Sequence, residues 1–136
     1  MRAHVVTALG AHQAQAQLGK IRERLSDEDE YPMVRAAAAQ AVAALCDRSA
    51  VSLLTSYALK LGDPMAEPGD HMIGAAALLA LGDLRPSDLE TRLGPLRAAR
   101  APAQARQAVR AVLQRPGTCG GAVAPKIPVK SRVPAS

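Results

Sequence analysis

The side chains best suited to chemistry in this chain are three histidines, and their spacing does not build a reactive site. His4, His12 and His71 are not placed four residues apart on a helix beside a glutamate, the arrangement that binds catalytic zinc. The sequence also has no Gly-x-Ser-x-Gly turn, no phosphate-binding glycine loop and no Gly-x-Gly-x-x-Gly run. We therefore expect solvent-facing histidines, no metal, no cofactor and no enzymatic activity.

The two cysteines, Cys46 and Cys119, are far apart in the sequence and lie in different contexts. Cys46 ends a helix whose pattern predicts burial, whereas Cys119 lies in a glycine-rich segment. We expect no disulfide framework, and hence a reducing compartment. The first residues lack the continuous apolar stretch of a secretion signal, and no apolar run is long enough to cross a membrane. The expected location is the cytoplasm, with the nucleus as the alternative, and the chain is not expected to be secreted.

Basic residues are concentrated in the C-terminal part of the chain. The formal net charge is +5, and residues 97–132 hold eight basic residues and no acidic one. This balance fits nucleic acid, an acidic partner or an anionic membrane surface, and it also fits ordinary solvated charge. Only Tyr31 and Tyr57 could stack on bases, so we place nucleic-acid binding below protein binding.

The elements that carry these residues are predicted to be helices. Hydrophobic residues make up 49% of the chain but aromatics only 1%, so the apolar content is mostly Ala, Leu and Val, and Ala and Leu lead the helix-propensity ranking. Ala14, Leu18, Ile21 and Leu25 follow one another at helical spacing. Similar patterns predict further helices over about residues 33–46, 50–61, 71–84, 88–100 and 103–114. Asp70 is expected to cap the fourth of these six helices, and Pro95 to kink or shorten the fifth.

One apolar pattern occurs twice along the chain. Residues 34–45 read VRAAAAQAVAAL and residues 73–84 read IGAAALLALGDL, so that Val34 corresponds to Ile73 and Leu45 to Leu84. Self-similarity at a period of a few tens of residues is typical of repeat architectures. The sequence therefore predicts a stack of helical hairpins.

Residues 25–38, LSDEDEYPMVRAAA, resemble the HEAT-repeat family of armadillo-type α-solenoids. In this family a helix ending in Leu is followed by an acidic turn, a Pro and a second helix that opens with Val-Arg and small residues. The resemblance covers roughly residues 3–114 and implies that Asp29 and Arg35 pair along the stack. It implies a fold and says almost nothing about activity.

We accordingly predict an all-α solenoid of about three HEAT-like hairpins, with a domain over residues 1–115 and a disordered basic tail over residues 116–136. Residues 3–9 resemble the end of a second helix whose first helix is missing, and Val5, Val6 and Leu9 form an open apolar edge. Terminal repeats normally carry a polar capping face. We therefore expect a fragment or short isoform of a longer solenoid, with neighbouring repeats as partners.

The predicted function is a non-catalytic scaffold for another protein. Second helices usually line the inner face of such stacks, which here means residues 33–46, 71–84 and 103–114. The candidate partner contacts are Arg35, Arg97, Arg100, Arg106 and Arg110. The alternative is a nucleic-acid binder that holds the phosphate backbone through the C-terminal arginines.

Overall fold

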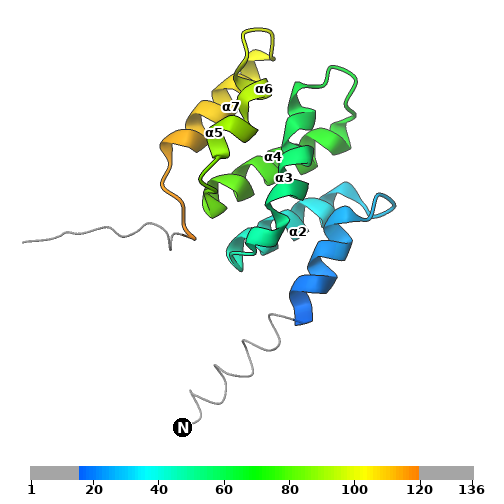
Figure 1. Cartoon of the computed structure of the whole chain (residues 1–136). Coiled ribbons are helices and arrows are strands. Elements are labelled where there is room, and N and C mark those ends of the chain that lie inside the picture. The colour runs from blue at the N-terminus through cyan, green and yellow to red at the C-terminus, as the bar shows by residue number, and fades with distance from the viewer. Residues whose placement is uncertain (1–15, 120–136) are drawn as a thin grey trace, which may run out of the picture.

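A computed structural model describes residues 16–119, and all regular structure in this range is helical. Figure 1 shows helical hairpins stacked one after another along the chain, with α2 towards one end and α5–α7 at the other. The predicted all-α solenoid is confirmed. The expectations for His4, His12, the apolar edge at residues 3–9 and the tail beyond residue 119 lie outside the described residues and stay predictions.

Each of the three hairpins pairs a first helical segment with a second helix. The helical segment over residues 16–26 precedes α2 (Pro32–Ala44). The second hairpin joins η1 (Arg48–Ala50), α3 (Val51–Ala58) and η2 (Leu59–Gly62) to α4 (Pro68–Leu84). The third consists of α5 (Leu89–Arg92), α6 (Gly94–Arg97) and α7 (Ala103–Gln114). The second helices α2, α4 and α7 lie in succession, with α4 in contact with both of the others.

Proline explains where two of the second helices begin. Pro32 and Pro68 each lie in the first turn of a helix, where the missing N–H has no intrahelical partner to lose. The expectation that Asp70 caps a helix starting at His71 is wrong, because α4 begins at Pro68. Glu67 is its N-cap, and Asp70 closes a capping box by accepting a hydrogen bond from the Glu67 N–H at 3.3 Å. Pro95 shortens the third hairpin's first helix as expected, dividing it into α5 and α6.

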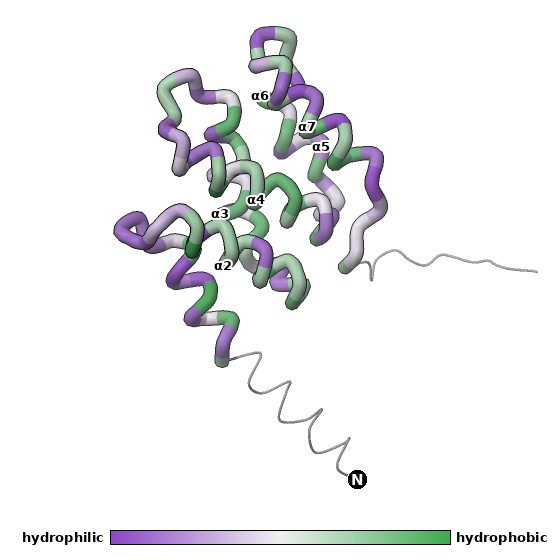
Figure 2. Tube along the Cα trace, turned by 180° about the vertical axis from the view of Figure 1, so that it is seen from behind, coloured by the Kyte–Doolittle hydropathy of each residue, from purple (hydrophilic) through white to green (hydrophobic). Residues whose placement is uncertain are grey.

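Helix α4 forms the centre of the hydrophobic core. Figure 2 shows hydrophobic residues along α4 and hydrophilic ones in the turns around it. Leu78, Leu81 and Leu84 are almost fully buried there, and two glycines of α4 allow neighbouring elements to come close. A Cβ at Gly74 would lie 2.9 Å from the Tyr57 carbonyl oxygen, and one at Gly82 would lie 2.8 Å from Val112 Cγ1. These contacts set the distances of α3 and α7 from α4.

A disulfide joins Cys46 to Cys119, so the expectation that no disulfide would form is wrong. The two cysteines are 73 residues apart in sequence, but their Cα atoms lie 5.5 Å apart, within the range that a disulfide spans. Stacking of the hairpins brings the chain after α7 back to the end of α2, which sequence spacing does not reveal. Residues 116–119, which we assigned to a disordered tail, pack against the protein, and Cys119 is buried. The argument for a reducing compartment therefore loses its basis, and the compartment itself stays a prediction.

Candidate protein-binding surfaces

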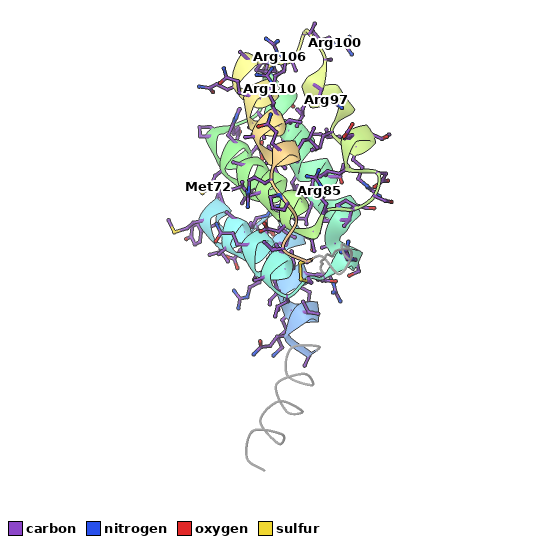
Figure 3. All side chains as sticks on the ribbon, turned by 90° about the vertical axis from the view of Figure 1, so that its left-hand side faces the viewer. Met72, Arg85, Arg97, Arg100, Arg106 and Arg110 are labelled. Carbon is purple, nitrogen blue, oxygen red and sulfur yellow. A yellow bond between two sulfur atoms is a disulfide. The ribbon has the colours of Figure 1, made fainter. Side chains whose placement is uncertain are left out.

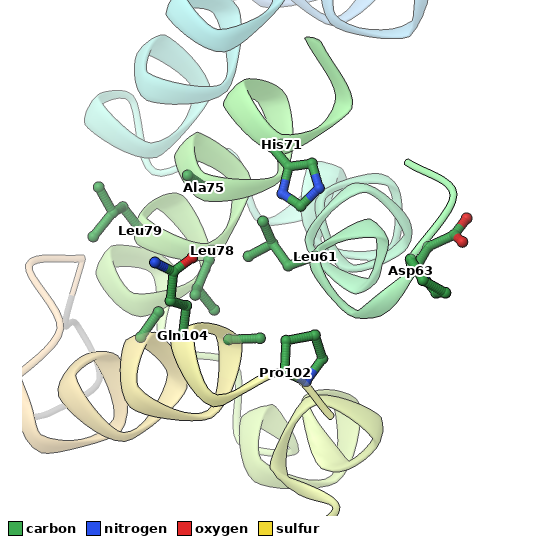
Figure 4. Close-up of a pocket in the computed structure, with 11 residues that line it drawn as sticks. Leu61, Asp63, His71, Ala75, Leu78, Leu79, Pro102 and Gln104 are labelled. Carbon is green, nitrogen blue, oxygen red and sulfur yellow. The ribbon is translucent and has the colours of Figure 1, made fainter. Parts of the chain in front are cut away.

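A groove of about 500 Å³ runs between α4 and α7. Figure 4 shows His71 and Leu61 near one end, with Leu79 and Gln104 facing each other across the two helices, whereas the Asp63 carboxylate points away. Most of the lining is apolar. The lining residues are Leu61, Asp63, Pro64, His71, Ala75, Leu78, Leu79, Pro102, Gln104, Ala105 and Ala108.

The groove exists because small residues face each other where α4 and α7 diverge. Ala75 on α4 and Ala105 and Ala108 on α7 leave space that larger side chains would fill. Farther along the same two helices, Gly82 and Val112 are in close contact. The pair is therefore open towards the N-terminal ends of both helices and closed at their C-terminal ends.

The rim of the groove on α4 is apolar and exposed. Leu79, which lines the groove, is 47% exposed, and so is Met72, which lies two turns earlier on α4 outside the lining; residues 71–82 contain no aspartate, glutamate, lysine or arginine. At the N-terminal side of this rim, residues 63–70 contain three acidic residues and no basic one. The sequence analysis did not single out Leu79 or Ala75, since it named residues 71–84 only as a second helix that lines the inner face of the stack. The helical period could have indicated the exposed side, because residues 72, 75 and 79 share one face.

Arg35, which we predicted to contact a partner, is instead an interior residue. It is 7% exposed, and its Nε donates to the Leu25 carbonyl oxygen at 3.0 Å. Its guanidinium carbon lies 5.0 Å from the centroid of the Tyr57 ring, in the range of a cation–π contact. Within the described residues no ion pair joins Arg35 to Asp29, in contrast to what the family resemblance implied. Arg35 therefore fastens the first hairpin to the second.

Three of the four remaining candidate arginines share one depression. Figure 3 shows Arg97, Arg100, Arg106 and Arg110 gathered at the end of the molecule formed by α6 and α7. Arg97, Arg106 and Arg110 line a hollow of about 430 Å³ together with Glu90, Val109, Leu113 and Gln114. We call this hollow the arginine depression. Arg100 lies outside it, beside Pro64 and Pro95.

The arginine depression is only partly neutralised by its own contacts. Arg97 Nη1 lies 3.5 Å from Glu90 Oε1, and both side chains are about half exposed or more. Arg106 Nε donates to the Ala101 carbonyl oxygen at 3.1 Å, which fixes its side chain and leaves its charge unpaired among the described residues. An exposed ion pair such as Arg97–Glu90 contributes little to stability. The charges of Arg97 and Arg106 therefore remain available to a partner.

The carboxyl group of Asp47, which follows α2, has a lowered pKa. Burial raises the pKa of its carboxyl, but hydrogen bonds from Ser49 and Arg22 outweigh that effect and hold the pKa below its usual value. Asp47 Oδ1 accepts from the Ser49 N–H at 3.2 Å and thereby caps η1. Asp47 thus connects the first hairpin to the second and belongs to the structure of that end.

No helix within residues 16–119 combines the length and the apolar character needed to cross a bilayer. Comparison with known families finds a match to HEAT repeats over residues 1–66, which include α2 and α3. Searches of curated proteins and of solved structures find no match to the chain.

Proposed function

We propose that this chain, which matches HEAT repeats over residues 1–66, is a non-catalytic scaffold whose α4–α7 groove binds a helical segment of a partner protein. HEAT repeats commonly act as protein-interaction scaffolds. Stacked repeats offer extended surfaces because each hairpin contacts only its neighbours along the stack.

The observation that carries the proposal is the exposed apolar rim on a groove of suitable size. An amphipathic helix binds a groove by inserting side chains at positions i, i+3, i+4 and i+7. Leu79 lines the groove beside Ala75, Ala105 and Ala108, and the exposed Met72 lies seven residues earlier on the same face of α4, next to the groove lining at His71. A helix with leucine-type anchors matches this length and chemistry.

Charge favours one orientation of the partner helix. The acidic loop, residues 63–70, carries Asp63 and Glu67 before α4 and Asp70 in the first turn of α4, and the lining of the groove contains no lysine or arginine. A lysine or arginine at one end of the partner helix would be attracted to this loop, since electrostatic complementarity fixes register and speeds association. The proposed occupant is therefore an amphipathic helix with apolar anchors and a basic end.

The test uses a synthetic amphipathic peptide with leucines at i, i+3, i+4 and i+7 and two lysines at one end. Its binding to the full chain is followed by fluorescence anisotropy. Leu79→Glu should weaken binding about tenfold, because it places a charge on the apolar rim. Met33→Glu is the matched control: Met33 is 71% exposed and lies on α2, outside the groove, so this variant should bind like the unmodified chain.

Equal affinity of the Leu79→Glu and Met33→Glu variants would contradict the assignment of the groove. A control peptide with two glutamates in place of the lysines should bind more weakly, and the difference should shrink as salt screens the acidic loop. Tighter binding of the glutamate peptide would contradict the proposed orientation.

The arginine depression supports a second function, which is binding of a nucleic-acid phosphate backbone. Arg97, Arg106 and Arg110 converge on one hollow, and Arg100 lies near the same end of the molecule. Contacts with phosphates release counterions, so the affinity falls steeply as salt rises.

A generic DNA duplex separates this function from protein binding. The double variant Arg106→Glu/Arg110→Glu should lower the slope of log affinity against log salt by about 2 if both arginines contact phosphates. Lys20→Glu/Lys60→Glu makes the same change in net charge at exposed residues outside the depression, and it is the control. Equal slopes for the two double variants would show that only net charge matters and would reject a nucleic-acid site here.

A further inference from the structure

The chain after α7 turns back and crosses the C-terminal ends of the other two second helices. Residues 115–119, which we call the strap, run beside the end of α4 towards the end of α2 (Figure 1). The N–H groups of Thr118 and Cys119 donate to the Asp83 carbonyl oxygen at 3.0 and 2.9 Å. Gly117 is needed for this path, because a Cβ there would lie 2.7 Å from Arg85 Cβ.

Two arginines bind the strap and the helix ends to one another. Arg48 donates to the Leu84 carbonyl oxygen and to the Cys119 carbonyl oxygen, each at 2.7 Å. Arg85, which ends α4 in the left-handed conformation at φ 49°, donates to the carbonyl oxygens of Val112, Leu113 and Arg115. Carbonyl groups at a helix C-terminus have no intrahelical donor, so Arg85 supplies partners to the last turn of α7.

The disulfide is the only covalent part of this arrangement. It fixes the strap to Cys46, which follows α2 and has φ 55°. The Cys46 residue is exposed, whereas Cys119 is buried. A thiolate from solvent therefore reaches the Cys46 sulfur more readily and releases Cys119 as the leaving thiolate.

The position of α7 depends on these attachments at its C-terminal end. At its N-terminal half α7 faces α4 across the groove, whereas Val112 packs on Gly82 and the strap begins one residue after α7 ends. Loss of the covalent link would leave the strap held by hydrogen bonds that water can replace. The segment with fewest other contacts to the core would then open first.

We propose that the Cys46–Cys119 disulfide and the strap form a reducible latch that holds α7 against α4. A dithiol reductant opens it: one thiolate attacks Cys46 Sγ and forms a mixed disulfide, and the second thiol displaces the Cys46 thiolate. The dithiol loses two electrons and two protons and becomes a cyclic disulfide, and Cys46 and Cys119 become thiols. Since α7 forms one wall of the groove, opening the latch also changes the groove, and this consequence alone rests on the proposed function.

The experiment is hydrogen exchange by mass spectrometry on the full chain, with and without dithiothreitol. Reduction should speed exchange about tenfold in residues 103–119 and leave α2 and α3 unchanged at short exchange times. The variant Cys46→Ser/Cys119→Ser should match the reduced chain and should not respond to dithiothreitol. Exchange in residues 103–119 that is unaffected by reduction overturns the proposal.

Two further outcomes also overturn it. If reduction speeds exchange equally in α2, α3 and α7, or abolishes the helical circular dichroism signal, the disulfide supports the whole fold and is no latch. The variant Arg48→Ala removes hydrogen bonds to the strap and keeps both sulfurs. The oxidised Arg48→Ala chain should exchange like the oxidised unmodified chain. The reduced Arg48→Ala chain should exchange faster than the reduced unmodified chain. If Arg48→Ala opens residues 103–119 in the oxidised chain, hydrogen bonds rather than the disulfide hold the strap.

Discussion

The two ends of the α4–α7 pair differ in how they are held. At the C-terminal ends, Gly82 allows Val112 to pack closely, and Arg85 donates to three carbonyl oxygens at the end of α7. At the N-terminal ends, the same two helices leave a groove lined by Ala75 and Ala105. Contact at one end and space at the other within a single helix pair show that local side-chain size, and not the helix pattern, decides where a surface is available.

The largest expected difference between the two ends concerns two leucines of α4. Leu84 is fully buried at the closed end, so Leu84→Ala should lower the free energy of unfolding by about 3 kcal/mol through lost burial and a residual cavity. Leu79 is 47% exposed at the open end, and Leu79→Ala should cost less than about 1 kcal/mol. Urea denaturation measures both, and similar costs for the two variants would remove the distinction between the ends.

The close contact between Gly82 and Val112 predicts a smaller loss of stability when Gly82 is enlarged. This loss depends on the side chain at position 112. In Gly82→Ala the new methyl meets Val112 Cγ1, and overpacking should outweigh the gain in helix propensity for a net cost of about 1 kcal/mol. In a Val112→Ala background this cost should disappear, which a double-mutant cycle detects.

At Gly19 a Cβ meets nothing within 4 Å, and Gly19→Ala should stabilise the chain by up to about 1 kcal/mol.

Asp47, which lies near the closed end, predicts that the free energy of unfolding depends on pH. Its lowered pKa means that its ionised form stabilises the folded chain above the unfolded-state pKa of about 3.9, and that this contribution is lost as the pH falls from there through the folded-state pKa. Asp47→Asn should therefore cost about 1 kcal/mol at pH 7 and much less at pH 3. Thermal melts of both chains at the two pH values test this, and an equal difference at both would contradict the role of the ionised carboxylate.

The smallest effect is expected for filling the groove. Ala75 is exposed and lines open space, so Ala75→Leu should change the free energy of unfolding by less than about 0.5 kcal/mol. The same variant should weaken binding of the leucine peptide, because the new side chain occupies the space of an anchor. A large loss of stability in Ala75→Leu would show that the open end is packed more tightly than the groove indicates.

The helices and their order follow from local patterns in the sequence. The repeat of residues 34–45 in residues 73–84, the prolines at positions 32 and 95, and the apolar spacing of Leu89, Leu93 and Leu96 are all properties of short windows. Residue type in these windows does not separate the two sides of α4, because Ala and Leu occupy both. The buried Leu84 and Leu79, which is 47% exposed, are the same kind of residue on one helix.

Two contacts that sequence reasoning missed join residues that are not neighbours in the chain. Arg35 suggested a surface charge, but Leu25 and Tyr57 provide it with a carbonyl acceptor and an aromatic face in the interior. Cys119 suggested a flexible segment, but it reaches Cys46 across 73 residues. Charge and residue type at one position do not reveal which distant group will meet it.

The sequence by itself determined that this chain forms stacked helical hairpins, because helix propensity, proline positions and apolar period act within a few residues. Only the tertiary structure decided that Arg35 is interior, that three arginines share one depression, that α4 and α7 separate around a groove, and that Cys46 meets Cys119. These features depend on the relative placement of hairpins. That placement is set by side-chain volumes at contacts such as Gly82–Val112, where a single methyl group moves one helix relative to another.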